Sequence, residues 1–136
     1  MTKLPRPNPS PAASRGTVSA AAMENVKKVW DAGIAVAMGT DAGNIGTLHG
    51  PSVFREMELM QAAGLTPAQI LQSATTNGAR MLGMEADLGD VAPGKVADLV
   101  ILDADPLADV KNLSRIHRVV RGGLLFDPDE LVRSIR

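Results

Sequence analysis

The spacing of hydrophobic residues predicts helices in the first half of the chain and short strands in the second half. Between residues 17 and 33 the apolar positions recur at helical intervals, as on one face of an amphipathic helix: Ala22, Val26, Val29 and Trp30. A glycine at the end of this stretch supplies the stop. A second helix is predicted over residues 51–64 and a short helix or turn over residues 77–82. A third helix begins at Thr66, which forms a capping box with Gln69.

A short apolar segment, residues 34–38, lies between Gly33 and Gly39. An uninterrupted apolar run of this length predicts a strand buried on both faces, as in parallel α/β sheets. The loop that follows, residues 39–46, is rich in glycine and polar residues and contains Asp41. Because α/β folds place their chemistry at the carboxyl ends of such strands, this loop is where a functional site is expected.

The second half of the chain has the pattern of a small antiparallel sheet. Residues 92–95 suit a type II turn, with proline and glycine at its central positions. A strand is expected over residues 97–102, a two-glycine turn joins strands 116–121 and 124–126 into a hairpin, and a short helix is expected over residues 129–136. One buried parallel strand and this β element do not make a closed sheet, because a lone buried strand needs neighbours on both edges. We therefore expect the complete sheet to contain strands from outside this sequence.

Composition and charge exclude several classes of function. The 14 basic and 15 acidic residues nearly cancel and neither sign forms a block, so we expect no nucleic-acid partner and no membrane partner. No apolar run approaches the roughly 20 residues that span a bilayer. The absence of cysteine excludes disulfides, thiolate metal sites and a cysteine nucleophile, and it fits a reducing compartment, which slightly favours the cytoplasm.

Several short motifs occur in a defined order along the chain. They are Gly39-Thr40-Asp41-Ala42-Gly43, His49-Gly50, Ala63-Gly64-Leu65-Thr66-Pro67, Ala74-Thr75-Thr76-Asn77 and Pro93-Gly94-Lys95-Val96-Ala97-Asp98. Each motif alone is weak, but their order and spacing together resemble the amidohydrolase superfamily, especially its imidazolonepropionase-like and prolidase-like members. The resemblance covers nearly everything from Asn25 to about Gly123.

The resemblance implies a (β/α)8 barrel combined with a small β-sandwich to which both chain ends contribute. Residues 34–38 then correspond to the eighth barrel strand, and residues 97–126 to the carboxyl-terminal share of the sandwich. The expected division is a flexible proline-rich lead-in over 1–16, the last part of the TIM-barrel domain over 17–88, and a sandwich segment with a terminal helix over 89–136. The chain is thus expected to be the C-terminal α/β segment of a longer metal-dependent amidohydrolase.

The same resemblance implies a role for Asp41. In this family the aspartate that follows the eighth strand binds the metal and moves a proton, and Asp41 occupies the matching position. A carboxylate suits both tasks, since it is a hard oxygen ligand for Zn²⁺ or a similar divalent ion and can accept a proton from metal-bound water. The implied reaction is hydrolysis of an amide-type C–N bond in a small molecule, either a cyclic amide or a dipeptide-like substrate. Outside this family pattern, Asp41 would more often be interpreted as a turn or cap residue.

The sequence departs from the family pattern in the other metal ligands. The family uses a His-x-His pair on the first strand, usually a carboxylated lysine on the fourth, and histidines on the fifth and sixth, all of which precede this segment. The histidines here are His49 and His117, and both follow Asp41. Because a catalytic zinc usually takes about three protein ligands, we expect the chain to be inactive by itself.

The two histidines have different expected roles. His49 lies in the loop after Asp41 and is a candidate to contact the substrate or a residue beside it, with an ordinary surface histidine as the alternative. His117 lies on a predicted strand of the sandwich, remote from the expected site, and is predicted to be solvated.

Two other kinds of function fit parts of the pattern. The chain could be a non-catalytic structural or association module, in which exposed strand edges drive the formation of a homo-oligomer. Asp41 could instead be a phosphoacceptor, as in receiver-type α/β domains, but no acidic cluster precedes it. A metal titration combined with a phosphodonor assay separates the phosphoacceptor from the metal ligand.

Overall fold

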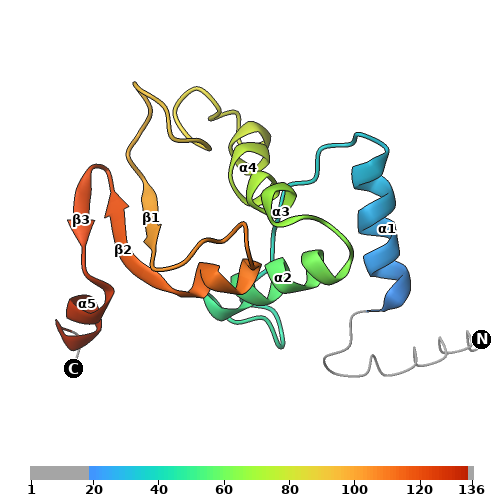
Figure 1. Cartoon of the computed structure of the whole chain (residues 1–136), viewed down its shortest axis with the longest axis horizontal. Helices are drawn as coiled ribbons and strands as arrows, with labels where there is room; N and C mark the ends of the chain where they lie inside the picture. The colour runs from blue at the N-terminus through green and yellow to red at the C-terminus, as the bar shows by residue number, and fades with distance from the viewer. Residues whose placement is uncertain (1–18, 135–136) are drawn as a thin grey trace, which may run out of the picture.

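The computed structural model describes residues 19–134, which form an α/β arrangement of short helices and one sheet (Figure 1). In chain order the elements are α1 (Ala20–Asp31), α2 (Pro51–Ala62), α3 (Pro67–Ala74), α4 (Thr76–Met81), β1 (Leu99–Leu102), the 3-10 helix η1 (Val110–Ser114), β2 (Ile116–Arg121), β3 (Leu124–Phe126) and α5 (Pro128–Ser134). Figure 1 shows α1 to α4 on one side and the sheet with α5 on the other, with η1 against α2 between them. None of the helices within residues 19–134 has the length and apolar character needed to cross a bilayer. The expectation for residues 1–16 lies outside the described part.

Polar side chains fix the starts of the predicted helices. Ser19 Oγ accepts a hydrogen bond from Ala22 N at 3.1 Å at the start of α1. At the start of α3, Thr66 Oγ1 accepts from Gln69 N at 3.3 Å, and Gln69 Oε1 accepts from Thr66 N at 2.8 Å. These two bonds satisfy backbone donors that have no partner within the helix, and Pro67 at the first helical position has no such donor. The predicted capping box is confirmed.

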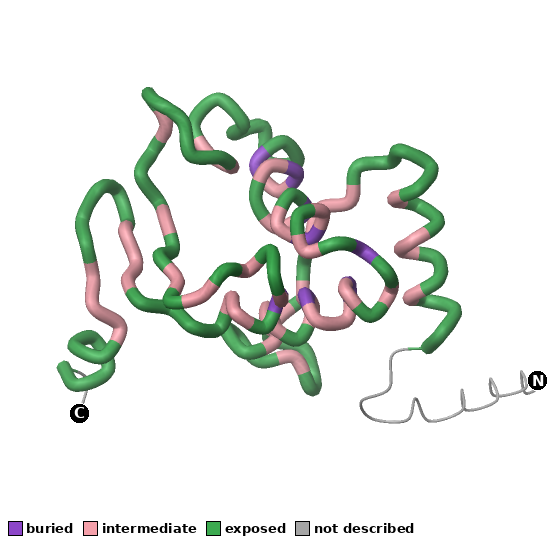
Figure 2. Tube along the Cα trace, in the orientation of Figure 1, coloured by how far each residue is buried: buried purple, intermediate pink, exposed green. Residues whose placement is uncertain are grey.

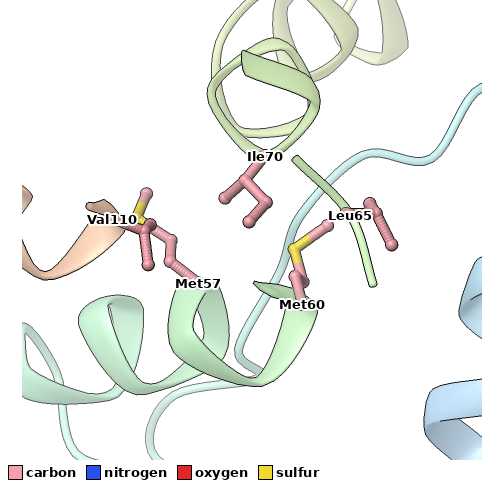
Figure 3. Close-up of a cluster of buried hydrophobic side chains, with 5 residues drawn as sticks. All are labelled: Met57, Met60, Leu65, Ile70 and Val110. Carbon is pink, nitrogen blue, oxygen red and sulfur yellow. The ribbon is translucent and has the colours of Figure 1, made fainter. Parts of the chain in front are cut away.

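A small hydrophobic core lies where α2, α3 and η1 meet (Figure 3). Its buried side chains are Met57, Met60, Leu65, Ile70 and Val110. Partly buried apolar side chains surround this cluster: Val26, Trp30, Val36, Met38, Val53, Ala63, Ala74 and Leu113. Figure 2 shows that the buried positions gather in the helical part and at η1, whereas the three strands contain no buried residue. The core therefore joins α1, α2, α3 and η1 and includes no residue of the sheet.

Residues 34–38 do not form the predicted strand. They have no regular secondary structure, and no strand within the described residues pairs with them. The carbonyl oxygen of Val36 instead accepts hydrogen bonds from Ser73 Oγ at 2.8 Å and from Asn77 Nδ2 at 2.9 Å. The apolar pattern is that of a buried strand, but a ladder forms only where neighbouring strands take up the backbone N–H and C=O groups. For the same reason Ile34, predicted to be buried, is 58% exposed.

The predicted strands of the second half form a three-stranded antiparallel sheet in the order β1-β2-β3. In its register, Val120 on β2 lies opposite Leu99 on β1 and opposite Leu125 on β3. Gly122 and Gly123, with φ values of 56° and 82°, make the predicted two-residue turn. Several apolar side chains of β1 and β3 are exposed: Val100, Ile101, Leu124 and Leu125. The prediction of a homo-oligomer through exposed strand edges therefore stays a prediction, with an uncovered sheet to support it.

The connection between α4 and β1 is held by Lys95 and Gly89. Lys95 Nζ donates to the backbone oxygens of Glu85 at 2.8 Å and Leu88 at 3.3 Å. Gly89 has a φ of 98° and lies directly against α4, where a Cβ atom would stand 2.7 Å from the Cβ of Ala79. Only glycine combines this backbone conformation with such a close approach. These two residues fix the connection against α4 and against itself.

Candidate functional site

Asp41 lies in the loop that joins segment 34–38 to α2. Its φ of 48° makes it the sole non-glycine residue with positive φ in the part of the chain that the structure describes, a conformation that aspartate tolerates better than most side chains. The residue is exposed, and Asn44 Nδ2 donates to its Oδ2 at a distance of 3.5 Å, which is a weak hydrogen bond. The carboxylate is therefore accessible to an ion or to a proton donor.

Thr47 closes the loop around Asp41. Its Oγ1 lies 3.2 Å from the backbone oxygen of Asp41 and 3.1 Å from that of Asn44, so its hydroxyl hydrogen is shared between the two. Gly43 N donates to Thr47 O at 3.0 Å, and Ile45 N donates to Asn44 Oδ1 at 2.8 Å. No sequence motif predicted a role for Asn44 and Thr47, although their residue types favour such side-chain to backbone bonds in loops. The loop thus fixes the backbone of Asp41 relative to the start of α2.

His49 packs over the same loop. A Cβ atom on Gly43 would stand 3.4 Å from His49 Nε2 and 3.8 Å from its Cε1, so the imidazole lies against the bare Cα of this glycine. Gly43 also has a φ of 102°, which a larger residue would adopt only with strain. No hydrogen bond within the described loop joins His49 to Asp41. The structure places His49 against Gly43 in the loop of Asp41, with no hydrogen bond between the two side chains.

The described residues do not bring together a set of metal ligands. Within residues 19–134, no group of three histidine, aspartate or glutamate side chains lies close enough to hold a metal ion. His117 pairs through Nδ1 with Asp103 Oδ1 at 3.0 Å on the sheet, and its half-exposed side chain agrees with the prediction of a solvated residue. Because a catalytic zinc usually takes about three protein ligands, Asp41 alone does not fit one.

Two shallow hollows on the described surface lie away from Asp41. One is formed by the connection before β1, along residues 90–99. The other lies between α1, segment 34–38 and α4, with Trp30 and Arg80 among its lining residues. Neither hollow includes Asp41 or His49, and both of these residues are exposed.

Glu56 is a partly buried carboxylate on α2, and burial raises its pKa above the usual value. Because the pKa of Glu56 is higher in the folded state than in the unfolded state, its contribution to stability is fully present at low pH. That contribution is lost as the pH rises through the folded-state pKa. We therefore expect Glu56→Gln to raise the melting temperature at neutral pH and to change it little near pH 4, roughly where the unfolded carboxyl titrates.

Thermal unfolding of both proteins across this pH range measures the effect of Glu56→Gln. Glu58→Gln is the matched control, because Glu58 lies on the same helix and makes a largely exposed pair with Arg55 at 3.2 Å, which contributes little. A lower melting temperature for Glu56→Gln at neutral pH would contradict the expectation, since it would mean that the ionised carboxylate is stabilised by a partner.

Comparisons with known proteins agree with the motifs around Asp41. The sequence model of the amidohydrolase family matches residues 10–125. The chain is 38% identical over 101 residues to the imidazolonepropionase of Streptomyces avermitilis, and the match covers 74% of this chain and 22% of that protein. It is 31% identical over 99 residues to the ochratoxinase of Aspergillus niger, and this match covers 70% of this chain and 20% of that protein.

Comparison with solved structures agrees with the sequence matches. The structure is similar to the crystal structure of a Xaa-Pro dipeptidase with a TM-score of 0.70 and 30% sequence identity, over 77% of this chain and 25% of that chain. The chain spans about a fifth of the length of the curated relatives it matches. These neighbours place the α/β chain in a superfamily of the TIM-barrel type. Since the family model matches most of the sequence, the chain belongs to the amidohydrolase family.

Proposed function

We propose that this chain is the carboxyl-terminal segment of a metal-dependent amidohydrolase. Residues 17–88 would supply the last part of its barrel, with segment 34–38 as the final strand, and residues 89–136 would supply one share of a β-sandwich. The observation that carries this proposal is segment 34–38 itself, which has the composition of a buried strand, leads to Asp41 and has no pairing strand among residues 19–134. Such a segment becomes a strand when neighbouring strands take up its backbone groups.

The reaction we propose is hydrolysis of an amide-type C–N bond in a small molecule. The resemblance of the motifs to imidazolonepropionase-like and prolidase-like enzymes supports a cyclic amide or a dipeptide-like substrate. An imidazolonepropionase and a Xaa-Pro dipeptidase among the similar proteins add support for the same two classes.

Asp41 is the residue of this chain to which we assign the chemistry. In the whole protein its exposed carboxylate would bind a zinc or similar divalent ion and would carry a proton. His49, which packs over the same loop, would contact the substrate or a residue beside it. The described residues do not fit a catalytic metal by themselves, so the proposal assigns the remaining ligands to parts of the protein outside residues 19–134. The chain by itself is then expected to be inactive.

A non-catalytic association module is the second candidate, and the uncovered sheet favours it. No residue of β1, β2 or β3 is buried, and both outer strands have an edge that no described strand pairs with. The mass of the purified chain by light scattering separates the two candidates from the start: a stable oligomer supports association, whereas a monomer supports a segment that needs the rest of the enzyme. Membership of the amidohydrolase family removes the support for a phosphoacceptor role of Asp41.

The direct test of the enzymatic proposal is a hybrid protein. The matching region of the Streptomyces avermitilis imidazolonepropionase, which is 38% identical to this chain over 101 residues, is replaced by this chain. We expect the hybrid to bind metal and to hydrolyse the substrate of that enzyme. A folded, metal-loaded hybrid without measurable hydrolysis would contradict the proposal that this chain completes an amidohydrolase site.

A further inference from the structure

Two buried polar side chains converge on one backbone oxygen far away in the sequence. Ser73, at the end of α3, is fully buried, and Asn77, on α4, is 5% exposed. Both donate to the carbonyl oxygen of Val36, at 2.8 Å and 2.9 Å, across sequence separations of 37 and 41 residues. Together the two donors use both lone pairs of that oxygen. We call this arrangement the Val36 clamp.

The clamp is completed by a bond in the other direction. Met38 N donates to the backbone oxygen of Ser73 at 3.2 Å, so Ser73 both gives a hydrogen bond to segment 34–38 and receives one from it. The side chains of Val36 and Met38 meanwhile pack against the core cluster. Three hydrogen bonds therefore hold this segment on α3 and α4, in a region where no described strand pairs with it.

The polar side chains of Ser73 and Asn77 indicate a role other than stabilising the fold. Burying a polar group costs free energy unless the group is fully bonded, and an apolar pair of similar shape can be nearly neutral for stability. What an apolar pair does not provide is direction, because hydrogen bonds fix the position and orientation of the carbonyl they hold. Ser73 and Asn77 therefore set where segment 34–38 lies along α3 and α4, and not only that it is buried there.

Asp41 follows this segment closely. It comes three residues after Met38, and Thr47 holds its backbone oxygen from the opposite side of the loop at 3.2 Å. Few residues separate Asp41 from these two attachments, and one residue spans at most about 3.6 Å. The backbone of Asp41 therefore has little freedom to move. The clamp and Thr47 thus determine together where the carboxylate is presented.

We propose that Ser73 and Asn77 are positioning residues for Asp41, which act through the carbonyl of Val36 and touch neither metal nor substrate. This inference deepens the proposed function and rests on the assignment of Asp41 to the active site. It predicts that loss of one clamp bond loosens segment 34–38 and Asp41 and leaves the end of helix α2, which makes none of these bonds, unchanged.

Amide hydrogen exchange and backbone order parameters of the full, isotope-labelled chain test the clamp by NMR. Ser73→Ala is the mildest change, because it removes one hydroxyl oxygen from a buried position. We expect the Met38 amide to exchange about ten-fold faster and the order parameter of Asp41 to fall. The amide of Ala63, the residue that follows α2, is bonded to Leu59 O at 2.9 Å and should keep its wild-type rate.

Thr75→Val is the matched control. Thr75 lies between the two clamp residues in the sequence, and its exposed hydroxyl donates to Leu71 O at 2.7 Å, so this change removes a hydroxyl-to-backbone hydrogen bond that does not reach Val36. The control should leave Met38 and Asp41 at wild-type values. Equal acceleration at Met38 and Ala63 in Ser73→Ala, or the same loosening in Thr75→Val, would overturn the proposal by showing a general loss of stability.

The second readout uses the hybrid enzyme. Ser73→Ala should lower kcat about ten-fold with little change in KM, because the substrate would bind as before while the Asp41 carboxylate would be out of position for the reaction. Asn77→Ala, which removes the second donor without burying a charge, should have the same effect. Unchanged kcat together with a loosened segment would overturn the positioning role. An inactive wild-type hybrid would count against the proposed function instead, and the exchange measurement would still decide whether the clamp holds Asp41.

Discussion

Replacing Asp41 by asparagine in the hybrid enzyme is expected to lower kcat about 10³-fold, in the range found when a proton-transferring side chain is lost. Asparagine keeps the shape of the side chain and tolerates the positive φ of 48° at this position. It loses the negative charge that suits a divalent ion and the oxygen that accepts a proton. The change therefore removes the proposed chemistry and leaves the loop intact.

Steady-state kinetics together with the metal content of each variant measures this effect. Asp31→Asn is the control, because Asp31 makes a surface pair with Lys27 at 2.6 Å on α1 and such exposed pairs contribute little. We expect the control to keep kcat within about two-fold of the wild type. An Asp41→Asn hybrid with nearly wild-type kcat and full metal content would contradict the role assigned to Asp41.

Gly89→Ala should lower the free energy of unfolding by about 3 kcal/mol, which is a large part of the stability of a small domain. A Cβ atom at this position would stand 2.7 Å from the Cβ of Ala79 and 3.1 Å from the Cα of Thr76, and φ is 98°. The methyl group therefore meets α4 itself as well as an unfavourable backbone conformation. The hydrogen bond from Thr76 Oγ1 to Gly89 O, at 3.1 Å, would be disturbed by the same shift.

Gly94→Ala separates the two causes. Gly94 has a φ of 88°, close to that of Gly89, but nothing lies within 4 Å of the Cβ that it would acquire. We expect this variant to lose about 1 kcal/mol, from backbone strain alone. Urea unfolding of both variants gives the difference. Equal losses for the two would show that α4 moves away without cost and that Gly89 is not needed for close packing.

The local features of the fold could be predicted because neighbouring residues decide them. The capping box at Thr66 depends on residues three positions apart, and the hairpin turn depends on Gly122 and Gly123. Segment 34–38 shows the limit of this reasoning. Its apolar run predicts a buried strand, but pairing requires other strands. Among residues 19–134 no strand pairs with it, and Ser73 and Asn77 bind the carbonyl oxygen of Val36 instead.

One part of the candidate site could be predicted from the sequence and another could not. Asp41 could be found from the motif around it, because the resemblance extends over most of the chain. The Val36 clamp could not be found, since its members are separated by 37 and 41 residues and no pattern marks which carbonyl a buried serine or asparagine will meet. A signal was present in Asn77, a polar residue within one of the motifs, but its partner became evident only from the fold.

In the proposed function, this chain supplies one ligand, Asp41, to a metal site that it does not complete. The decisive measurement is the metal content, by mass spectrometry, of purified chain that has been washed with chelator and reloaded with zinc. We expect far less than one zinc per chain, with no difference between the wild type and Asp41→Ala. One zinc per chain that is lost in Asp41→Ala would contradict it, because a site would then assemble from residues of this chain alone.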